Sequence, residues 1–290
     1  MVGTVVDFRI LSPQDSGSVL PSLSLKLPPV IGHRGAAARA PENTLAGLRR
    51  AKTLGCAWVE FDVRLTADGA LVLCHDARLD RTTDRTGLVA GHCLAAIRQC
   101  DAGNWFGPAF TGERMPTLEK ALTLAAELGL GTNVEVKADR GLEYATAAAL
   151  ADIVNRLDPA PPAMLVSSFL PAALCTLRDL APQTSRGVLF RAVPSGWAEI
   201  AKRLGVVVVG ADHRRLRPRR VAEMRAAGYP VAAYTVNDPA RARLLFEWGV
   251  TSVFSDVPDM ILQLGAIGDS TRPAPSGSPA AARAQQGAVQ

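Results

Sequence analysis

The sequence predicts an α/β fold in which parallel strands close into a barrel and helices cover the outside. Short apolar runs rich in β-branched residues alternate with amphipathic helical segments over about 230 residues, the pattern of strands joined by helical crossovers. No GxGxxG motif follows the first strand, which disfavours a dinucleotide-binding sheet. The polar motifs lie at strand ends, where a barrel gathers its chemistry.

The predicted elements begin with a strand over 30–35. A helix follows, with Asn43 or Thr44 as its N-cap and Gly55 as its C-cap. Strands at 58–66 and 70–76 flank a turn, and an irregular stretch covers roughly 77–116. The pattern then predicts a helix at 118–128 and strands at 133–138, 164–169, 187–191, 206–211, 231–236 and 253–255, with helices at 172–180, 197–204, 218–227, 239–248 and 258–264.

The two ends of the chain are predicted to be peripheral to the barrel domain, which we place at 30–265. Residues 1–29 form a mixed N-terminal extension interrupted by prolines, and 266–290 form a Ser/Pro/Ala/Gly-rich tail that we expect to be disordered. The first residues lack a signal-peptide pattern, and no apolar run is long enough to span a bilayer. We therefore expect a cytoplasmic protein without stable membrane insertion.

Charge and cysteine usage narrow the range of partners. Lys plus Arg exceed Asp plus Glu by 32 to 27, a balance that suits an anionic substrate. No basic run is interleaved with aromatic residues, so we expect no nucleic-acid binding. The five cysteines are scattered without a CxxC pair, which disfavours a disulfide framework or a zinc site. Nothing in the sequence specifies an oligomeric state.

Two motifs place charged residues at the ends of the first two strands. His33 and Arg34 stand between two glycines, which allow a ligand to approach the backbone, although a tight turn with incidental polar residues has the same pattern. In the second strand, alternation puts Glu60 and Asp62 on one face. Two buried carboxylates repel each other and are costly to desolvate, and a hard cation with oxygen ligands removes both costs. The alternative is an edge strand with a solvated face.

A histidine is predicted to join these carboxylates through a hairpin. Asp68-Gly69 is typical of a two-residue turn, and counting outward from it pairs Asp62 with His75. The Cβ atoms of such a pair lie about 4.5–5.5 Å apart on one face. The segment is therefore not a simple strand–helix–strand unit.

Glu135 and Lys137 share a face of the strand Asn133-Val134-Glu135-Val136-Lys137. One interpretation is an internal ion pair that neutralises itself. Beside Glu60 and Asp62, the other interpretation gains weight, because a third carboxylate completes a cation site and the lysine can hold a phosphate oxygen.

Taken together, these motifs resemble those of the glycerophosphodiester phosphodiesterase family. The resemblance covers the chain from 30 to 265, and its first half is the more specific. It rests on His33-Arg34-Gly35, Pro41-Glu42-Asn43-Thr44, Glu60-Phe61-Asp62-Val63, Thr66-Ala67-Asp68-Gly69, His75-Asp76, Asp80-Arg81-Thr82-Thr83, Pro116-Thr117-Leu118-Glu119, Glu135-Val136-Lys137, Ser168-Phe169 and Tyr234-Thr235-Val236-Asn237.

The resemblance implies a TIM-type (β/α)8 barrel with a small insertion after the second catalytic histidine. It also implies hydrolysis of glycerophosphodiesters to sn-glycerol 3-phosphate and an alcohol such as choline or ethanolamine, with one divalent metal ion, Mg²⁺ or Ca²⁺. The site residues that it implies are the metal ligands Glu60, Asp62 and Glu135, the acid–base pair His33 and His75, the phosphate-binding cations Arg34 and Lys137, and the aromatics Phe169 and Tyr234 at the glycerol end of the pocket.

Some choices stay open at this point. By family analogy His33 activates the glycerol 2-hydroxyl and His75 protonates the leaving group, but the roles are exchangeable. Phe169 and Tyr234 are equally compatible with the core, and the family usually has tryptophan where Tyr234 stands. A lysophospholipase D-type enzyme acting on membrane lipids shares the catalytic set. A non-catalytic phosphate-binding barrel is the alternative from another class, although a binder needs no acid–base pair.

Overall fold

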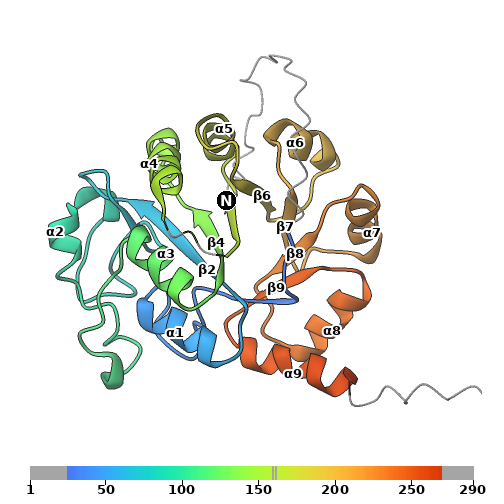
Figure 1. The fold of residues 1–290 in the computed structure, drawn as a ribbon, viewed down its shortest axis with the longest axis horizontal. Coiled ribbons are helices and arrows are strands. Elements are labelled where there is room, and N and C mark those ends of the chain that lie inside the picture. The colour runs from blue at the N-terminus through green and yellow to red at the C-terminus, as the bar shows by residue number, and fades with distance from the viewer. Residues whose placement is uncertain (1–24, 159, 161, 270–290) are drawn as a thin grey trace, which may run out of the picture.

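The computed structural model describes residues 25–158, 160 and 162–269 of the chain. Over these residues, parallel strands form a closed barrel that helices surround (Figure 1). The barrel strands are β1 (Val30–Gly32), β2 (Trp58–Leu65), β4 (Gly131–Val136), β5 (Met164–Ser168), β6 (Ser185–Phe190), β7 (Val208–Asp212), β8 (Val231–Tyr234) and β9 (Ser252–Ser255). The barrel closes because β1 pairs with both β2 and β9, Ile31 lying opposite Trp58 and Phe254. The predicted TIM-type barrel is confirmed.

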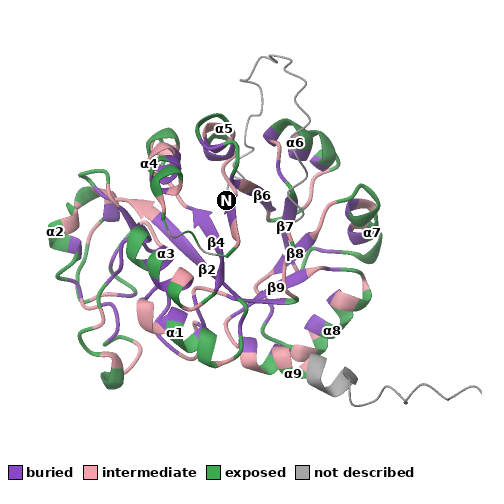
Figure 2. Ribbon diagram, in the orientation of Figure 1, coloured by how far each residue is buried: buried purple, intermediate pink, exposed green. Residues whose placement is uncertain are grey.

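The outer helices bury one face against the strands and expose the other, as Figure 2 shows. The first of them starts where a threonine side chain caps it, since Thr44 accepts a hydrogen bond from the backbone of Gly47. Four others begin with proline at the first turn, a position that needs no N–H donor. The helices are α1 (Leu45–Thr53), α3 (Leu118–Glu127), α4 (Glu143–Arg156), α5 (Pro171–Leu180), α6 (Trp197–Leu204), α7 (Pro218–Ala226), α8 (Pro239–Glu247) and α9 (Pro258–Asp269).

The helix α4 lies where the sequence pattern predicts none. Its buried face consists of Thr146, Ala147, Leu150, Ala151 and Ile153, so small residues weaken the apolar stripe that marks a surface helix. At the far end, α9 continues to Asp269, past the predicted start of the tail at 266. Residues 1–24 of the predicted extension and 270–290 of the predicted tail lie outside the described residues.

The hairpin after β2 differs from the predicted register by one residue. Strand β3 (Leu71–Leu73) runs antiparallel to β2 with Val63 opposite Leu73, and Cys74 donates to the carbonyl of Asp62. The expected pairing of Asp62 with His75 is therefore wrong. The turn is longer than two residues because the amide of Thr66 bonds to Ala70, which leaves 67–69 as the loop. Gly69 takes the left-handed conformation that such a loop requires, with φ +83°.

The insertion after this hairpin, which we define as residues 77–116, has a small core of its own. It contains the short helix α2 (Leu94–Ile97) and two 3₁₀ turns, Val89–Gly91 and Pro108–Phe110. Leu79, Ile97 and Met115 are buried together with Val72 and Cys74 from the hairpin. The insertion is therefore packed against the barrel beside β2 and β3, as Figure 1 shows on the left.

The inside of the barrel is filled below the strand ends. Trp58 lies on the same face of β2 as Glu60 and Asp62, one layer nearer the amino end. It packs in a buried cluster with Ile31, Leu165, Val208, Ala232 and Phe254, one from each of five other strands. This apolar layer is the floor beneath the polar residues and keeps water from reaching them from below.

Replacing Gly131 with alanine is expected to destabilise the barrel floor. Gly131 lies opposite Trp58, and a Cβ atom there would stand 2.3 Å from the indole Cε2. The indole has to leave its place, so we expect the free energy of unfolding in urea to fall by about 1–3 kcal/mol. Gly196→Ala is the control, since no atom lies within 4 Å and its φ is −85°. Equal stability of both variants would contradict this packing.

Candidate active site

The polar residues predicted from the motifs meet in one cavity at the carboxyl end of the strands. The cavity measures about 420 Å³. The predicted site residues that line it are His33, Arg34, Glu60, His75, Glu135, Lys137, Phe169 and Tyr234. Asp62 does not line the cavity, but one of its carboxylate oxygens lies within 4.8 Å of oxygens from Glu60 and Glu135. The structure therefore brings all the predicted site residues together.

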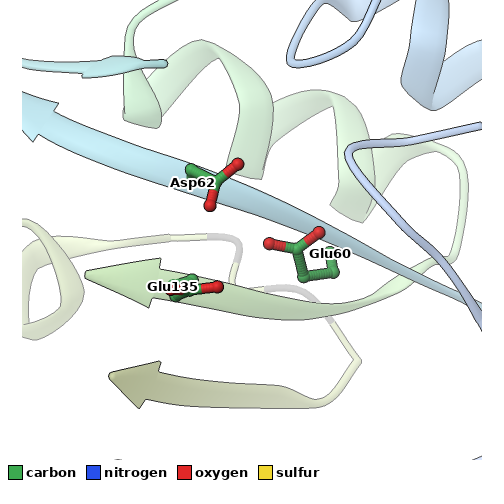
Figure 3. Close-up of side chains that lie close together, drawn as sticks. All are labelled: Glu60, Asp62 and Glu135. Atoms are coloured by element: carbon green, nitrogen blue, oxygen red, sulfur yellow. The ribbon is translucent and has the colours of Figure 1, made fainter. Parts of the chain in front are cut away.

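Three carboxylates converge from two neighbouring strands (Figure 3). Glu60 and Asp62 stand on one face of β2, and Asp62 lies opposite Glu135 of β4 in the parallel register. The three side chains are buried, with Glu60 2%, Asp62 0% and Glu135 8% exposed. Strand alternation and register thus fix the relative positions of the three carboxylates without a contribution from the loops.

The pKa shifts of the three carboxyl groups indicate how their charges are balanced. Burial, followed by the charge of Asp62, raises the pKa of Glu60 to about 8. Burial also raises the pKa of Glu135, with Lys137 opposing the rise. At Asp62 burial acts in the same direction, but Lys137 and Arg34 outweigh it and lower the pKa. At neutral pH Glu60 therefore holds a proton unless another cation takes the place of that proton.

The donor set fits a hard divalent cation. All three groups offer carboxylate oxygen, and one oxygen of each is buried without a hydrogen-bond partner within the described part of the chain. Lys137 lies near those of Asp62 and Glu135, which leaves Oε1 of Glu60 without an ion pair among the described residues. Such an orphaned oxygen is costly unless a cation or a proton satisfies it. Oxygen-only ligands suit Mg²⁺ or Ca²⁺ rather than a thiolate-binding metal. The chain thus carries a buried acidic triad suited to a divalent ion.

Arg34 is held against the triad by both its backbone and its side chain. Its amide donates to Oε2 of Glu60 at 2.8 Å, and its Nε lies 3.3 Å from Asp62. A second carboxylate, Glu42, accepts from its Nη1 at 2.8 Å. Asn43 completes the arrangement by donating to Asp62 at 3.0 Å and accepting from the Asp62 amide at the same distance. The guanidinium is therefore oriented at the edge of the cavity.

Lys137 approaches Asp62 at the other carboxylate oxygen, Oδ1, whereas Arg34 approaches Oδ2. Its Nζ stands 2.6 Å from Glu135 and 3.3 Å from Asp62, and 5.6 Å from the centre of the Phe169 ring. The rings of Phe169 and Tyr234 contact each other edge-on, with 5.6 Å between their centres. The Tyr234 hydroxyl donates to the carbonyl of Phe190. Both aromatic residues line the cavity and form part of its wall, and Tyr234 also packs against the apolar layer beneath it.

His33 is oriented by a carboxylate from the last barrel strand. Its Nδ1 lies 2.6 Å from Oδ1 of Asp256, which leaves Nε2 toward the triad, 3.8 Å from Glu60. Asn237 fixes Asp256 by donating to its carboxylate and accepting from its amide. Burial lowers the pKa of His33, but Glu60 and Asp256 outweigh burial and raise it. A cation that neutralises Glu60 removes the larger of these two causes.

His75 has a matching arrangement. Its Nδ1 lies 2.7 Å from Oδ1 of Asp76, which leaves Nε2 available. Burial lowers the pKa of His75, and Arg34 and Lys137 act in the same direction against Asp62. Each histidine thus has one nitrogen occupied by a carboxylate and the other free to exchange a proton, the geometry of an acid–base pair.

The sequence patterns did not reveal the partners that orient these groups. Asp256 is 223 positions from His33, and only its place directly after the last strand was a signal. Glu42, next to the predicted N-cap, pairs with Arg34 and with Arg81. Arg81 stood in a quoted motif without any assigned role. These contacts join distant loops, which local periodicity does not describe.

Comparison with known proteins identifies the family. The sequence profile of the "Glycerophosphoryl diester phosphodiesterase family" matches residues 33–260. The chain belongs to this family. It is accordingly an enzyme that hydrolyses glycerophosphodiesters, as the motifs predict.

Individual relatives cover most of the chain. A glycerophosphodiester phosphodiesterase of Bacillus subtilis is 31% identical over 249 residues, which are 79% of this chain and 84% of that protein. One from Caldanaerobacter subterraneus is 30% identical over 236 residues, 81% of this chain and 96% of that one. The solved structure of an Oleispira antarctica phosphodiesterase, in complex with the product sn-glycerol-3-phosphate, is 39% identical. It superposes with a TM-score of 0.80 and covers 83% of this chain and 97% of that one.

Divalent ions are expected to stabilise the protein through the triad. At a hundred times the Kd, Ca²⁺ or Mg²⁺ should add about 2.7 kcal/mol to the free energy of unfolding, measured as a rise in Tm. Because the ion displaces the proton of Glu60, whose pKa is about 8, the rise should be larger at pH 8 than near pH 6.

The variant Glu60→Gln should lose most of this rise in Tm. The control Asp152→Asn, which removes an exposed carboxylate from α4, should keep it. A Glu60→Gln protein that is stabilised as much as the wild type would rule out Glu60 as a ligand.

Proposed function

We propose that the protein cleaves glycerophosphodiesters to sn-glycerol 3-phosphate and an alcohol such as choline or ethanolamine, with one Mg²⁺ or Ca²⁺ at Glu60, Asp62 and Glu135. The observation that carries the proposal is the convergence of that triad with two carboxylate-oriented histidines in a single cavity. Relatives with this activity, and the solved phosphodiesterase complex with sn-glycerol-3-phosphate, support the same substrate class.

The charged residues bind the phosphodiester group. Arg34 and Lys137 each lie beside one carboxylate oxygen of Asp62 and add fixed positive charge where negative charge develops on the phosphoryl oxygens. When bound, the divalent ion polarises the phosphoryl group. Phe169 and Tyr234 line the wall and are proposed to contact the glycerol end.

The two histidines move the protons. His33 takes the proton of the glycerol 2-hydroxyl at Nε2, and the hydroxyl oxygen attacks phosphorus. The P–O bond to the alcohol breaks as His75 gives its Nε2 proton to the departing oxygen, and a cyclic phosphate remains. Water then opens the ring, with His75 taking the proton of the water and His33 returning one to the 2-oxygen. Asp256 and Asp76 hold the rings so that each Nε2 faces the cavity.

The size of the site favours small diesters over membrane lipids. A cavity of about 420 Å³ is in the range of small-molecule sites. Among the described residues, none of the helices has both the length and the apolar character needed to cross a bilayer. The paired histidines favour catalysis over phosphate binding alone, because binding needs no acid–base pair.

The direct test is release of sn-glycerol 3-phosphate from a panel of glycerophosphodiesters, with and without EDTA. We expect release that EDTA abolishes and that Mg²⁺ or Ca²⁺ restores, because the triad needs a cation. Faster turnover of lysophosphatidylcholine than of glycerophosphocholine would favour the lipid-cleaving alternative. Metal-stabilised protein without hydrolysis of any diester would favour a binding protein.

Removing His75 is expected to stop the chemistry without unfolding the site. His75→Ala should lower kcat by about 10²–10⁴, the range for a lost acid or base. The rise in Tm with Ca²⁺ should remain, since His75 is not a proposed ligand. His92→Ala, in the insertion, removes an imidazole that contacts the carbonyl of Leu88; it serves as the control and should keep wild-type turnover. A near-normal kcat of His75→Ala would contradict the assignment of His75 as an acid–base residue.

A further inference from the structure

Arg81 reaches the site from the insertion without lining the cavity. Its backbone is held in place locally, because Thr83 donates to the carbonyl of Leu79 from both its amide and its hydroxyl. Leu79 is fully buried in the core that joins the insertion to the hairpin. The guanidinium therefore extends from a fixed segment, not from a freely moving loop.

The guanidinium of Arg81 binds two carboxylates at once. Its Nε donates to Oδ2 of Asp76 at 2.7 Å. Its Nη1 and Nη2 donate to the two oxygens of Glu42 at 2.7 and 2.8 Å, a bidentate pair. Glu42 precedes α1, whereas Asp76 follows β3, so one side chain connects two loops that are far apart in the sequence.

Each of these carboxylates has a second partner in the active site. The other oxygen of Asp76, Oδ1, lies 2.7 Å from Nδ1 of His75. Oε1 of Glu42 also accepts from Nη1 of Arg34 at 2.8 Å. Asp76 thus links Arg81 to His75, the proposed leaving-group acid, and Glu42 links Arg81 to Arg34, a proposed phosphate ligand.

The charges in this network depend on one another. Glu42 lies between two guanidinium groups, and although burial opposes it, Arg81 and Arg34 lower its pKa. Two hydrogen bonds lower the pKa of Asp76 to about 2, and the one from Arg81 has a larger effect than the one from His75. Both carboxylates therefore stay charged over the range in which histidine titrates, and each keeps its second partner oriented.

We propose that Arg81 is a positioning residue that aligns His75 and Arg34 through Asp76 and Glu42, and that the insertion serves the reaction through this contact. The inference rests on the proposed function, since it assumes the roles given there to His75 and Arg34. Without Arg81, Asp76 loses the bond to Oδ2 and can rotate, so the imidazole of His75 loses its fixed orientation. Glu42 loses two of its three guanidinium bonds as well, so its carboxylate holds Arg34 less firmly.

The expected effect of Arg81→Ala is a fall in kcat of about 10–100-fold, the usual cost of losing a group that orients a catalytic residue. The rise in Tm with Ca²⁺ should stay at the wild-type value, because the triad is untouched. Arg81→Lys should recover part of the rate, and millimolar guanidinium chloride should recover part of it in Arg81→Ala. Arg85→Ala, an exposed arginine of the same insertion, is the matched control and should keep wild-type kcat.

A double-mutant cycle separates positioning from general damage. If Arg81 acts through His75, Arg81→Ala should cost far less in a His75→Ala background than in the wild type. An equal loss in both backgrounds overturns the proposal, as does a loss accompanied by a smaller rise in Tm with Ca²⁺, or kcat equal to that of Arg85→Ala. Wild-type turnover in His75→Ala would instead refute the proposed function itself, so the two failures are distinguishable.

Discussion

The structure depends on three carboxylates that the barrel forces close together out of water. Glu60, Asp62 and Glu135 bring three negative charges, and Arg34 and Lys137 bring two positive ones. These five groups together carry one net negative charge. A bound divalent cation would change it to one net positive charge, which would suit the single negative charge of a phosphodiester.

The barrel supplies the precision that this balance needs. Parallel register sets Asp62 beside Glu135, and alternation along β2 sets Glu60 beside them, with Trp58 below. The two histidines proposed as acid and base come instead from the loops beyond the strands, where each is bonded to a carboxylate. His33 is held by Asp256 in the loop after β9, and His75 by its neighbour Asp76. The strands thus position the three carboxylates, and the loops position the two histidines.

Much of the fold and site was predictable because both depend on local patterns. Alternation within strands placed Glu60 with Asp62 and Glu135 with Lys137, and strand–helix alternation indicated the barrel. The pattern failed where small residues replace large apolar ones, as in α4. It also failed at the hairpin, where Asp68-Gly69 indicates a tight turn. Asp68 instead accepts from Thr66 and from the backbone of Leu94 in the insertion, which favours a longer loop. Contacts such as Arg81 with Glu42 arise only once the chain is folded.

We propose that these three carboxylates together bind one divalent ion. Anomalous scattering from crystals grown with Ca²⁺ would test this binding. We expect one strong peak in the cavity, with oxygens of Glu60, Asp62 and Glu135 at about 2.3–2.6 Å from it. A peak elsewhere with none between the carboxylates, or a water-like density there at saturating Ca²⁺, would contradict it.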